Sequence, residues 1–444
     1  MYKSSIFNVI EYFDDVAMIY NSLYGRVFRI NNAKELKDLL NGEINTELHN
    51  ALFHQLVEDG ILVDEKIDEK ALSAMKFYDN IYNPTLNLVL LPTEQCNFRC
   101  TYCYESFSRG KMTKECQNAI ISYLKQNINR YTGVELSWFG GEPLMAMDVI
   151  DYISAETIKI CHAVGKPFSA SVTTNGYFLT LDNINLLRKN RINSYQITID
   201  GPQICHDKTR VLANGKGTYY TIINNLRTIR DGCKSKTFGI SIRTNITYEV
   251  LPYIDDYIKF LHDEFAGDPR FSFYFRPVGN WGGDKAQDME NVMVNSLSSY
   301  YKPIIGSRYV LNTDSYIQLL NAPLCAAAKR NCFIIGTDSS VYKCTMLFDN
   351  PENKLGILSD DGRLIIDDDR YAKWIIRDLN KTECGDCFYY PRCNGGTCPA
   401  EGHVLKSGDG CGYEKKSIKH ILHLIYKDSS SPCTRAKIKI YNYN

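Results

Sequence analysis

Six short runs rich in β-branched and aromatic residues alternate with stretches of helical spacing, and this rhythm constrains the fold more than any other feature. Strands that alternate with helices form parallel sheets, because each helix carries the chain back across the sheet. Six such units are fewer than the eight that close a barrel. The sequence therefore predicts an α/β fold built on a partial (β/α)6 TIM-like barrel. The six runs are 86–91, 134–139, 168–174, 194–199, 238–244 and 271–277.

Each predicted strand runs into a loop of distinctive composition. In parallel barrels the reactive groups gather in the loops at the carboxyl ends of the strands. We therefore expect these loops to meet at one mouth and to carry the chemistry. In chain order they are CNFRCTYC (96–103), GGEP (140–143), TNG (174–176), DG (200–201), Asn245 and VGNWGG (278–283).

The composition favours a cytoplasmic metalloprotein. The amino-terminal twenty residues include Glu11, Asp14 and Asp15, and no run of eighteen apolar residues occurs in the sequence, so we expect neither a secretory signal nor a membrane segment. In a reducing cytoplasm sixteen cysteines are better explained by metal binding than by disulfides. The formal net charge of zero supplies no general field for nucleic acid, and we expect no nucleic-acid partner.

Cys96, Cys100 and Cys103 lie within eight residues, directly after the first predicted barrel strand. A structural zinc site would need a fourth ligand from elsewhere, whereas an iron–sulfur cubane held by three cysteines leaves one iron open to a small molecule. The spacing alone allows both. The aromatic Tyr102 inside the triplet and the GGEP segment after the next strand favour the open cluster. With these motifs, residues 84–305 resemble the radical S-adenosylmethionine (radical SAM) superfamily.

This resemblance implies that the triplet holds a [4Fe–4S] cluster whose open iron binds S-adenosylmethionine. Reduction by a flavodoxin- or ferredoxin-type donor would cleave S-adenosylmethionine to methionine and a 5′-deoxyadenosyl radical. The resemblance also implies the residues that bind the cofactor, while it assigns no catalytic residue. The implied cofactor-binding residues are Tyr102, Gly140, Gly141, Glu142, Pro143, Asn175, Thr198, Asp200, Arg210 and Val278. Asn175 could equally belong to an ordinary Asn-Gly turn.

A second group of cysteines follows the predicted barrel. Closely spaced pairs could build zinc sites, but the pattern resembles the SPASM extension of peptide-modifying radical SAM enzymes, which binds two auxiliary [4Fe–4S] clusters. The resemblance implies three clusters in the chain. Cys384, Cys387, Cys393 and Cys411 would hold the outer auxiliary cluster, and Cys325, Cys344 and Cys398 the inner one. Cys332 would either be the fourth ligand of the inner cluster or take no part, in which case the inner cluster would keep one open iron.

The segment before the barrel reads as strands, two helices and a further strand, which is the order of a small winged-helix-like α+β module. This order resembles the leader-recognition domains of peptide maturases, although packing against the barrel would explain it equally. A leader would bind as a strand added to the sheet edge. The expected domains are 1–82 for leader recognition, 83–305 for the partial barrel, 306–425 for the SPASM iron–sulfur domain and 426–444 for a C-terminal tail.

The resemblance leads to one main functional hypothesis and two alternatives. The main hypothesis is a maturase that installs an oxidative crosslink, expected to be a thioether, in a precursor peptide with a leader. The first alternative is an anaerobic sulfatase-maturating enzyme that forms formylglycine. That class commonly has Asp after the second upstream SPASM ligand, where this chain has Thr345. The second alternative, a non-catalytic iron–sulfur or zinc scaffold, is disfavoured by the intact GGEP segment.

Overall fold

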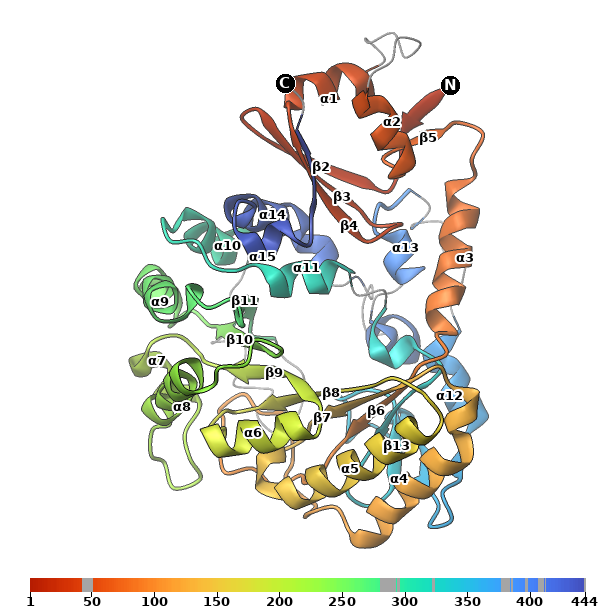
Figure 1. The fold of residues 1–444 in the computed structure, drawn as a ribbon, viewed down its shortest axis with the longest axis vertical. Helices are drawn as coiled ribbons and strands as arrows, with labels where there is room; N and C mark the ends of the chain where they lie inside the picture. The colour runs from red at the N-terminus through yellow and green to blue at the C-terminus, as the bar shows by residue number, and fades with distance from the viewer. Residues whose placement is uncertain are drawn as a thin grey trace. The chain divides into compact units, whose positions relative to one another are not determined.

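The computed structural model describes residues 1–41, 51–279, 293, 296–321, 324–376, 384, 386–395, 398–405, 411 and 413–442. The contacts divide the chain into two compact units, each built from separate segments. One unit, called here the terminal unit, consists of 1–82, 312–329 and 375–444. The other, called the barrel unit, consists of 83–311 and 330–374 (Figure 1).

The barrel unit is organised around six parallel strands that lie side by side in sequence order. Each predicted run agrees with an observed strand to within two residues, so the prediction of a parallel α/β sheet is confirmed. Among the described residues β11 pairs only with β10, so the barrel stays open. The strands are β6 (Leu86–Leu90), β7 (Val134–Trp138), β8 (Phe168–Thr174), β9 (Ile192–Thr198), β10 (Gly239–Ile246) and β11 (Phe271–Pro277).

Helices cover the outer side of these strands (Figure 1). Their starts follow from side-chain caps: Thr113 accepts a hydrogen bond from the Cys116 amide at 3.2 Å, and Thr180 accepts one from the Asn183 amide at 3.2 Å. The helices are α4 (Lys114–Asn127), α5 (Met147–Ala163), α6 (Leu181–Lys189), α7 (Gln203–Thr209), α8 (Tyr219–Gly232), α9 (Ile254–Leu261) and α10 (Leu297–Gly306).

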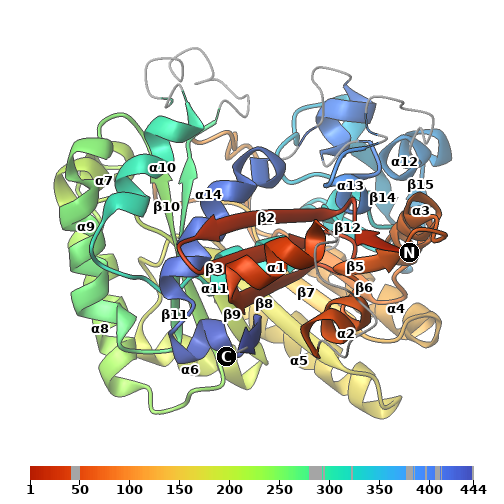
Figure 2. The same ribbon diagram turned by 90° about the horizontal axis from the view of Figure 1, so that it is seen from above.

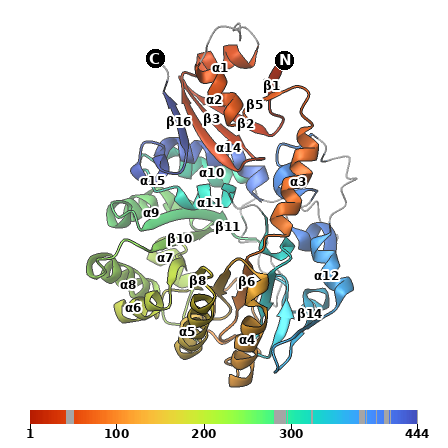
Figure 3. The same ribbon diagram turned by 45° about the vertical axis from the view of Figure 1, so that its right-hand side comes forward.

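The sheet continues beyond β6 with strands that the sequence analysis did not predict. Here β12 (Cys332–Ile335) pairs with β6 in parallel, and three antiparallel strands follow it. The first barrel strand is therefore not an edge strand, and segments about 240 positions apart share one sheet (Figure 3). The added strands are β13 (Ser340–Tyr342), β14 (Lys354–Leu358) and β15 (Leu364–Ile366), and α12 (Asp368–Ile375) comes next in the chain.

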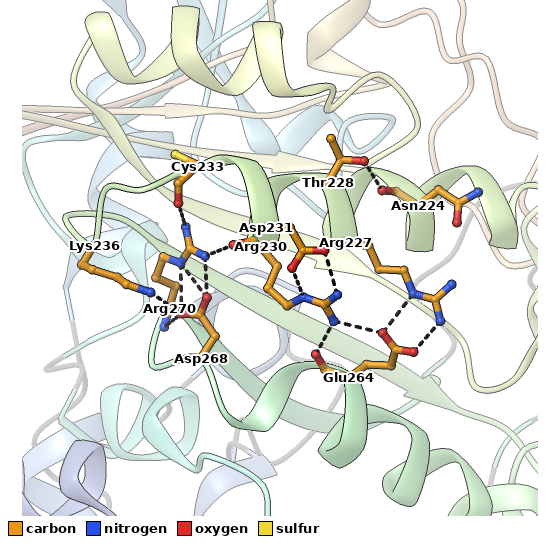
Figure 4. Close-up of polar contacts among 10 residues, drawn as sticks. All are labelled: Asn224, Arg227, Thr228, Arg230, Asp231, Cys233, Lys236, Glu264, Asp268 and Arg270. Atoms are coloured by element: carbon orange, nitrogen blue, oxygen red, sulfur yellow. Dashed lines mark hydrogen bonds and ion pairs between the residues drawn. The ribbon is translucent and has the colours of Figure 1, made fainter.

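An ion network lies between the end of α8 and the amino-terminal end of β11 (Figure 4). Glu264, in the π-helical turn η4 (His262–Ala266), accepts from Arg227 Nε at 2.9 Å and from Arg230 Nη1 at 3.0 Å. Arg270 directly precedes β11 and is 3 % exposed. It binds Asp268 and donates to the Cys233 carbonyl at 2.5 Å. The network therefore joins the end of α8 to the start of β11.

The terminal unit contains the predicted hairpins. The strands β2 (Asn8–Phe13), β3 (Val16–Asn21) and β4 (Arg26–Asn31) form an antiparallel sheet. The helices α1 (Ala33–Leu40) and α2 (Ala51–Glu58) share one core cluster with this sheet. The predicted order of three strands, two helices and a strand is confirmed, and residues 46–50 of the second predicted helix lie outside the described residues. Beside these elements stand β1 (Tyr2–Ser4), which pairs with β5 (Leu62–Asp64), and α3 (Glu69–Ile81).

Segments from the end of the sequence complete the terminal unit. Helix α14 (Tyr413–Asp428) packs against β2 and β3, where Phe13 stacks on Tyr426 at 4.4 Å between ring centroids (Figure 2). The strand β16 (Lys439–Asn442) pairs with β4 in parallel. Residues expected to form a tail thus extend the amino-terminal sheet. The unit also contains α11 (Asp314–Asn321), α13 (Tyr390–Cys393) and α15 (Pro432–Arg435). No helix among the described residues is long and apolar enough to cross a membrane.

Candidate active site

The cysteine triplet lies in the loop after β6, and backbone hydrogen bonds hold that loop in place. The Arg99 amide donates to the Val211 carbonyl at 2.8 Å, and the Thr101 amide donates to the Thr209 carbonyl at 2.9 Å. The loop after β6 is thereby fastened to the segment that follows α7. Because β6 and β9 end at the same edge of the sheet, the triplet lies at the carboxyl ends of the strands, as the sequence analysis predicted.

The three thiols are shielded from water and lie near one another. Cys100 is buried, and Cys96 and Cys103 are half-buried. Burial raises the pKa of the Cys96 thiol to about 12, and Glu142, Cys100 and Cys103 act in the same direction. Burial likewise raises the pKa of Cys103 to about 11. Thiolates in such a place need a positive partner, and the irons of a cluster supply one. The donor set therefore fits an iron–sulfur cluster.

Among the described residues no group of three or more His, Cys, Asp or Glu side chains has the arrangement that holds a metal ion. For these residues the finding argues against a site for a single metal ion, whose ligands converge on one point. The thiolates of a cubane bind different irons and need not converge in this way.

The GGEP segment after β7 begins with two residues whose backbone conformation favours glycine. Gly140 and Gly141 have φ of 82° and 46°, in the left-handed region. A Cβ on Gly141 would lie 2.3 Å from the Gln95 carbonyl oxygen, in the loop of the triplet. The Gly141 amide donates to Glu105 Oε2 at 2.5 Å. Close contact between the two loops therefore requires a glycine at position 141.

Glu142 clamps this segment to the TNG loop after β8. Its carboxylate is fully buried and accepts from Thr174 Oγ1 at 2.6 Å, from the Asn175 amide at 2.7 Å and from the Leu144 amide at 3.0 Å. Pro143 then begins a 3-10 turn, η2 (Pro143–Ala146). The chain itself supplies these partners of the Glu142 carboxylate, which hold the GGEP segment against the TNG loop. Its role in binding the cofactor stays a prediction.

The Asn175 side chain lies against the cysteine triplet. Its Nδ2 donates to Asn97 Oδ1 at 2.8 Å and lies 3.9 Å from Cys96 Sγ. The sequence left open whether Asn175 is a ligand or only a turn residue. The structure places its amide at the mouth of the barrel, beside a predicted cluster ligand.

Tyr102, Asp200 and Arg210, three of the predicted cofactor residues, form one buried polar group. The Tyr102 hydroxyl donates to Asp200 Oδ2 and accepts from Arg210 Nη1 at 2.9 Å and from Asn245 Nδ2 at 3.0 Å. His206, which the sequence analysis did not single out, supports this group. Its Nδ1 accepts from the Asp200 amide at 3.2 Å, so its Nε2 carries the proton toward Thr218 Oγ1 at 3.0 Å. Burial and Arg210 lower the pKa of His206 well below 6.5, which keeps its ring neutral.

Two buried donors at this mouth have no partner in the described structure. They are Nε of Arg210, a residue that is 8 % exposed, and Nδ2 of Asn97. Buried donors are rarely left unpaired, so a ligand with acceptor oxygens fits beside them. S-adenosylmethionine carries a carboxylate and ribose hydroxyls. The mouth therefore fits both the cluster and its expected ligand. Asn97 was missed in the sequence, although its place inside the triplet could have pointed to it.

The remaining two predicted residues, Thr198 and Val278, lie at the ends of β9 and β11, on either side of β10. Thr198 is the last residue of β9 and is paired with Arg243 of β10. Val278 follows β11 and donates its amide to the Ile246 carbonyl at 3.0 Å. Both lie at the carboxyl ends of their strands. The rest of the VGNWGG loop, residues 280–283, lies outside the described residues.

The cysteines expected to hold the outer auxiliary cluster lie in the terminal unit. The Cys387 amide donates to the Cys384 carbonyl at 3.1 Å. Lys415 Nζ lies 3.2 Å from Cys411 Sγ, and although burial acts to lower the pKa of Lys415, Cys411 and Cys387 raise it. Tyr390 is close enough to Cys384 and Cys393 for both thiols to act on its pKa. The unit thus brings together thiols that are up to 27 positions apart.

The cysteines expected to hold the inner auxiliary cluster come from both units. In the terminal unit Cys325 acts on the pKa of Cys398, which burial raises. In the barrel unit Cys332 begins β12 and is 2 % exposed, whereas Cys344 follows β13 and its amide donates to Asn353 Oδ1 at 2.7 Å. Cys332 pairs its backbone within the sheet, and its role as a ligand stays a prediction.

A central parallel sheet thus carries a thiol triplet, a glycine-lined loop and unpaired donors at its carboxyl edge, an arrangement that can hold a cofactor at the mouth of an open barrel. Residues 90–257 match the model of the Radical SAM superfamily. The chain therefore contains a radical SAM domain, and it is an enzyme of radical chemistry.

Known proteins with similar sequences or folds include maturases. The chain is 22% identical over 343 residues to a cysteine-type anaerobic sulfatase-maturating enzyme of Clostridium novyi, covering 70% of this chain and 87% of that protein. It has the fold of anSMEcpe with bound AdoMet, with a TM-score of 0.59, 18% identity and coverage of 80% and 98%. It also resembles Streptococcus suis SuiB bound to precursor peptide SuiA, with a TM-score of 0.52, 16% identity and coverage of 92% and 98%.

Proposed function

We propose that this radical SAM enzyme is a peptide maturase that forms an oxidative crosslink, most simply a thioether, in a precursor peptide with a leader. The observation that carries the proposal is the composition of the terminal unit, which joins a strand-and-helix module to a cysteine-rich segment. The module, residues 1–82, would recognise the leader, and residues 83–305 would cleave S-adenosylmethionine. Residues 306–425 would hold the auxiliary clusters, and residues 426–444 follow as a further segment. The enzyme would work in the cytoplasm with a flavodoxin or ferredoxin as donor.

The residues of the barrel mouth support the cleavage step. When bound, the cluster and S-adenosylmethionine supply a 5′-deoxyadenosyl radical that takes a hydrogen atom from a carbon. The unpaired Nε of Arg210 can bind the cofactor carboxylate in a charge-assisted hydrogen bond. The glycine backbone at 140–141 allows close approach of the methionine end. Glu142 and the Tyr102 group hold these loops in register.

Forming a thioether requires a second electron acceptor. One C–H and one S–H bond break and one C–S bond forms, so the peptide loses two hydrogens and two electrons. The first electron leaves with the hydrogen atom taken by the radical, and the second must leave with a proton of the thiol. The cysteines of the terminal unit support this step, because an iron–sulfur cluster is a suitable one-electron acceptor.

The first test replaces Cys96, Cys100 and Cys103 by Ala in one variant. Reconstituted wild type should contain about twelve irons per chain for three cubanes, and the variant should lose about a third of them. The variant should also release no 5′-deoxyadenosine under reducing conditions. Metal analysis that finds tightly bound zinc and no iron in the wild type would overturn the proposal.

The second test identifies the bond. The precursor peptide, to be sought among short reading frames beside this gene, should lose about two mass units per crosslink, and each crosslink should consume one thiol that alkylation can detect. A product that loses the same mass but keeps every thiol reactive would rule out a thioether and favour a carbon–carbon bond.

Formation of formylglycine in a sulfatase is the second candidate, and the similarity to the Clostridium novyi maturase supports it. Thr345 next to Cys344 argues against it, because a threonine cannot serve as the carboxylate base expected at that position. A sulfatase-derived cysteine peptide incubated with the reduced enzyme decides between the two. An aldehyde that reacts with a hydrazine reagent would favour the second candidate.

A further inference from the structure

One edge of the amino-terminal sheet is filled by a strand from a distant part of the chain. The order of this sheet is β16-β4-β3-β2, and β16 runs parallel to β4, from the pair Lys439–Phe28 to the pair Asn442–Asn31. The other three strands form continuous antiparallel hairpins. Without β16, the backbone groups along the outer side of β4 would be free to pair with any extended peptide.

An apolar socket beside this edge holds one aromatic side chain of β16. Tyr441 is 4 % exposed and stacks on Phe28 with 6.2 Å between ring centroids and 4° between ring planes. The same cluster contains Ile30 of β4 and apolar residues of both helices, including Leu36 and Leu52. A buried aromatic anchor in a pocket is the usual centre of a peptide-binding surface.

A buried carboxylate lies beside the socket and binds the basic residue two positions before the aromatic one. Lys439 Nζ lies 2.5 Å from Asp59 Oδ2, and Asp59 is 5 % exposed. Residues i and i+2 of a strand share one face. Lys439 Nζ accordingly lies 5.4 Å from the centre of the Tyr441 ring. The strand that fills this edge therefore presents a basic residue, any residue and an aromatic residue in that order.

The chain on the amino side of β16 is anchored independently of the strand. In α15, Thr434 Oγ1 donates to Asp428 Oδ2 at 2.5 Å, and Asp428 also accepts from the Thr313 amide at 2.8 Å. The side chains of 435–437 between this anchor and Ile438 are exposed. β16 itself is a four-residue edge strand, and short edge strands are among the segments that open locally with least cost.

We propose that the β4 edge and the Tyr441 socket form a peptide-binding site, and that β16 is an internal mimic that a basic–x–aromatic segment of the precursor peptide displaces. This inference rests on the proposed function, because it takes a peptide as the substrate. A tethered strand acts at an effective concentration in the millimolar range. Only a precursor segment that pairs over more than four residues or fills the socket better displaces it. The occupied edge therefore excludes peptides that match poorly.

The direct test uses the sequence of β16 itself as the probe. A labelled peptide of residues 437–442 is titrated into the full chain and into a variant that ends at Ala436, and binding is followed by fluorescence anisotropy. We expect the shortened chain to bind the probe at least about tenfold more tightly, since the tethered competitor is gone. A probe with Ala in place of Tyr441 should bind at least about tenfold more weakly. Equal binding to both chains, or binding to neither, would overturn the proposal.

A second variant keeps the test decisive if the shortened chain does not fold. Tyr441→Ala in the full chain empties the socket and should speed hydrogen exchange of the β4 amides, together with tighter binding of the probe. Tyr12→Ala is the matched control, because Tyr12 lies on β2 at the other edge and is 39 % exposed. It should change neither readout. Unchanged exchange in Tyr441→Ala, or the same change in the control, would show that β16 is a permanent strand.

The third arm separates this proposal from the proposed function. The precursor encoded beside the gene is added to the shortened chain with the probe bound. Release of the probe supports the site. A precursor that the enzyme modifies but that never releases the probe would overturn the mimic while leaving the maturase intact. A precursor that releases the probe but is never modified supports the site and counts against the maturase.

Discussion

At the scale of single residues, the predicted site contains a few positions that are tightly surrounded by the rest of the chain. Gly141, Glu142 and Arg210 each combine deep burial or tight contact with a defined partner. The resemblance of the sequence to the radical SAM superfamily implied all three as cofactor-binding residues. Their partners, such as the Gln95 carbonyl that faces Gly141, come from other loops and were not predictable from spacing.

Gly141→Ala should abolish close contact between the GGEP loop and the loop of the triplet. The added Cβ would meet the Gln95 carbonyl oxygen at 2.3 Å, and the positive φ adds strain. We expect the affinity for S-adenosylmethionine to fall at least about tenfold, or about 1.4 kcal/mol, measured by calorimetry on the reconstituted enzyme. Gly165→Ala is the control, because Gly165 also has positive φ but an added Cβ there would meet nothing within 4 Å. Equal affinity in Gly141→Ala and wild type would contradict this role of Gly141.

The buried His206 predicts a specific pH dependence of stability. Its folded pKa is lowered by burial and by Arg210, so below the ordinary pKa of about 6.5 the unfolded chain binds a proton that the native chain does not. The free energy of unfolding should therefore fall as the pH drops below about 6.5, by up to about 1.4 kcal/mol per pH unit from this group. Urea unfolding at several pH values from about 7 to about 5 measures the slope.

His206→Asn is the comparison for that slope. The variant lacks the titrating ring, so its unfolding free energy should change less steeply with pH, even if it is less stable throughout. Parallel slopes for the variant and the wild type would exclude His206 as the source.

At the scale of elements, an ion network fastens the amino-terminal end of β11, the end away from the predicted site, to helix α8. The network of Figure 4 ties α8, the π-helical turn and the start of β11 together through arginines and acids. Sequence periodicity located these elements but not their connections, because ion pairs between α8 and η4 join residues 34 to 37 positions apart.

Arg270→Ala should destabilise the barrel unit strongly. The change leaves the Asp268 carboxylate, which is 9 % exposed, without its main partner and removes donors to the carbonyls of Cys233 and Arg230. Breaking a buried ion pair costs about 3–5 kcal/mol. Lys236→Ala removes an exposed partner of the same acid, 3.6 Å away, and should cost less than about 1 kcal/mol. Chemical denaturation compares the two, and similar losses would show that the buried Arg270 contributes no more than the exposed lysine.

At the scale of the whole molecule, the two compact units do not follow the order of the sequence. The amino-terminal module shares the terminal unit with 375–444, and β16 completes its sheet. Deleting residues 1–82 would therefore remove the apolar cluster into which Tyr441 packs and leave that side chain exposed, so single substitutions test leader recognition more cleanly than deletion.

Replacing Cys384 and Cys387 by Ala should separate the cleavage of S-adenosylmethionine from peptide modification. Both residues lie in the terminal unit, whereas every residue expected to bind S-adenosylmethionine lies in the barrel unit. We expect the loss of about four of about twelve irons, some remaining 5′-deoxyadenosine formation and little crosslinked peptide. Cys433→Ala is the control and should keep all the iron. An unchanged iron content in the double variant would remove these cysteines from the cluster.

The sequence by itself determined the six parallel strands, the loops at their carboxyl ends and the residue types for a radical SAM site. These features are local: strand periodicity, turn residues and cysteine spacing depend on neighbouring positions. Only the tertiary structure decided which groups satisfy one another. In the folded chain the Glu142 carboxylate holds two loops together, and Arg210 Nε and Asn97 Nδ2 have no partner among the described residues. The strand β12 pairs with β6, and β16 pairs with β4. Such pairings follow from packing and burial between distant positions, where local patterns carry no information.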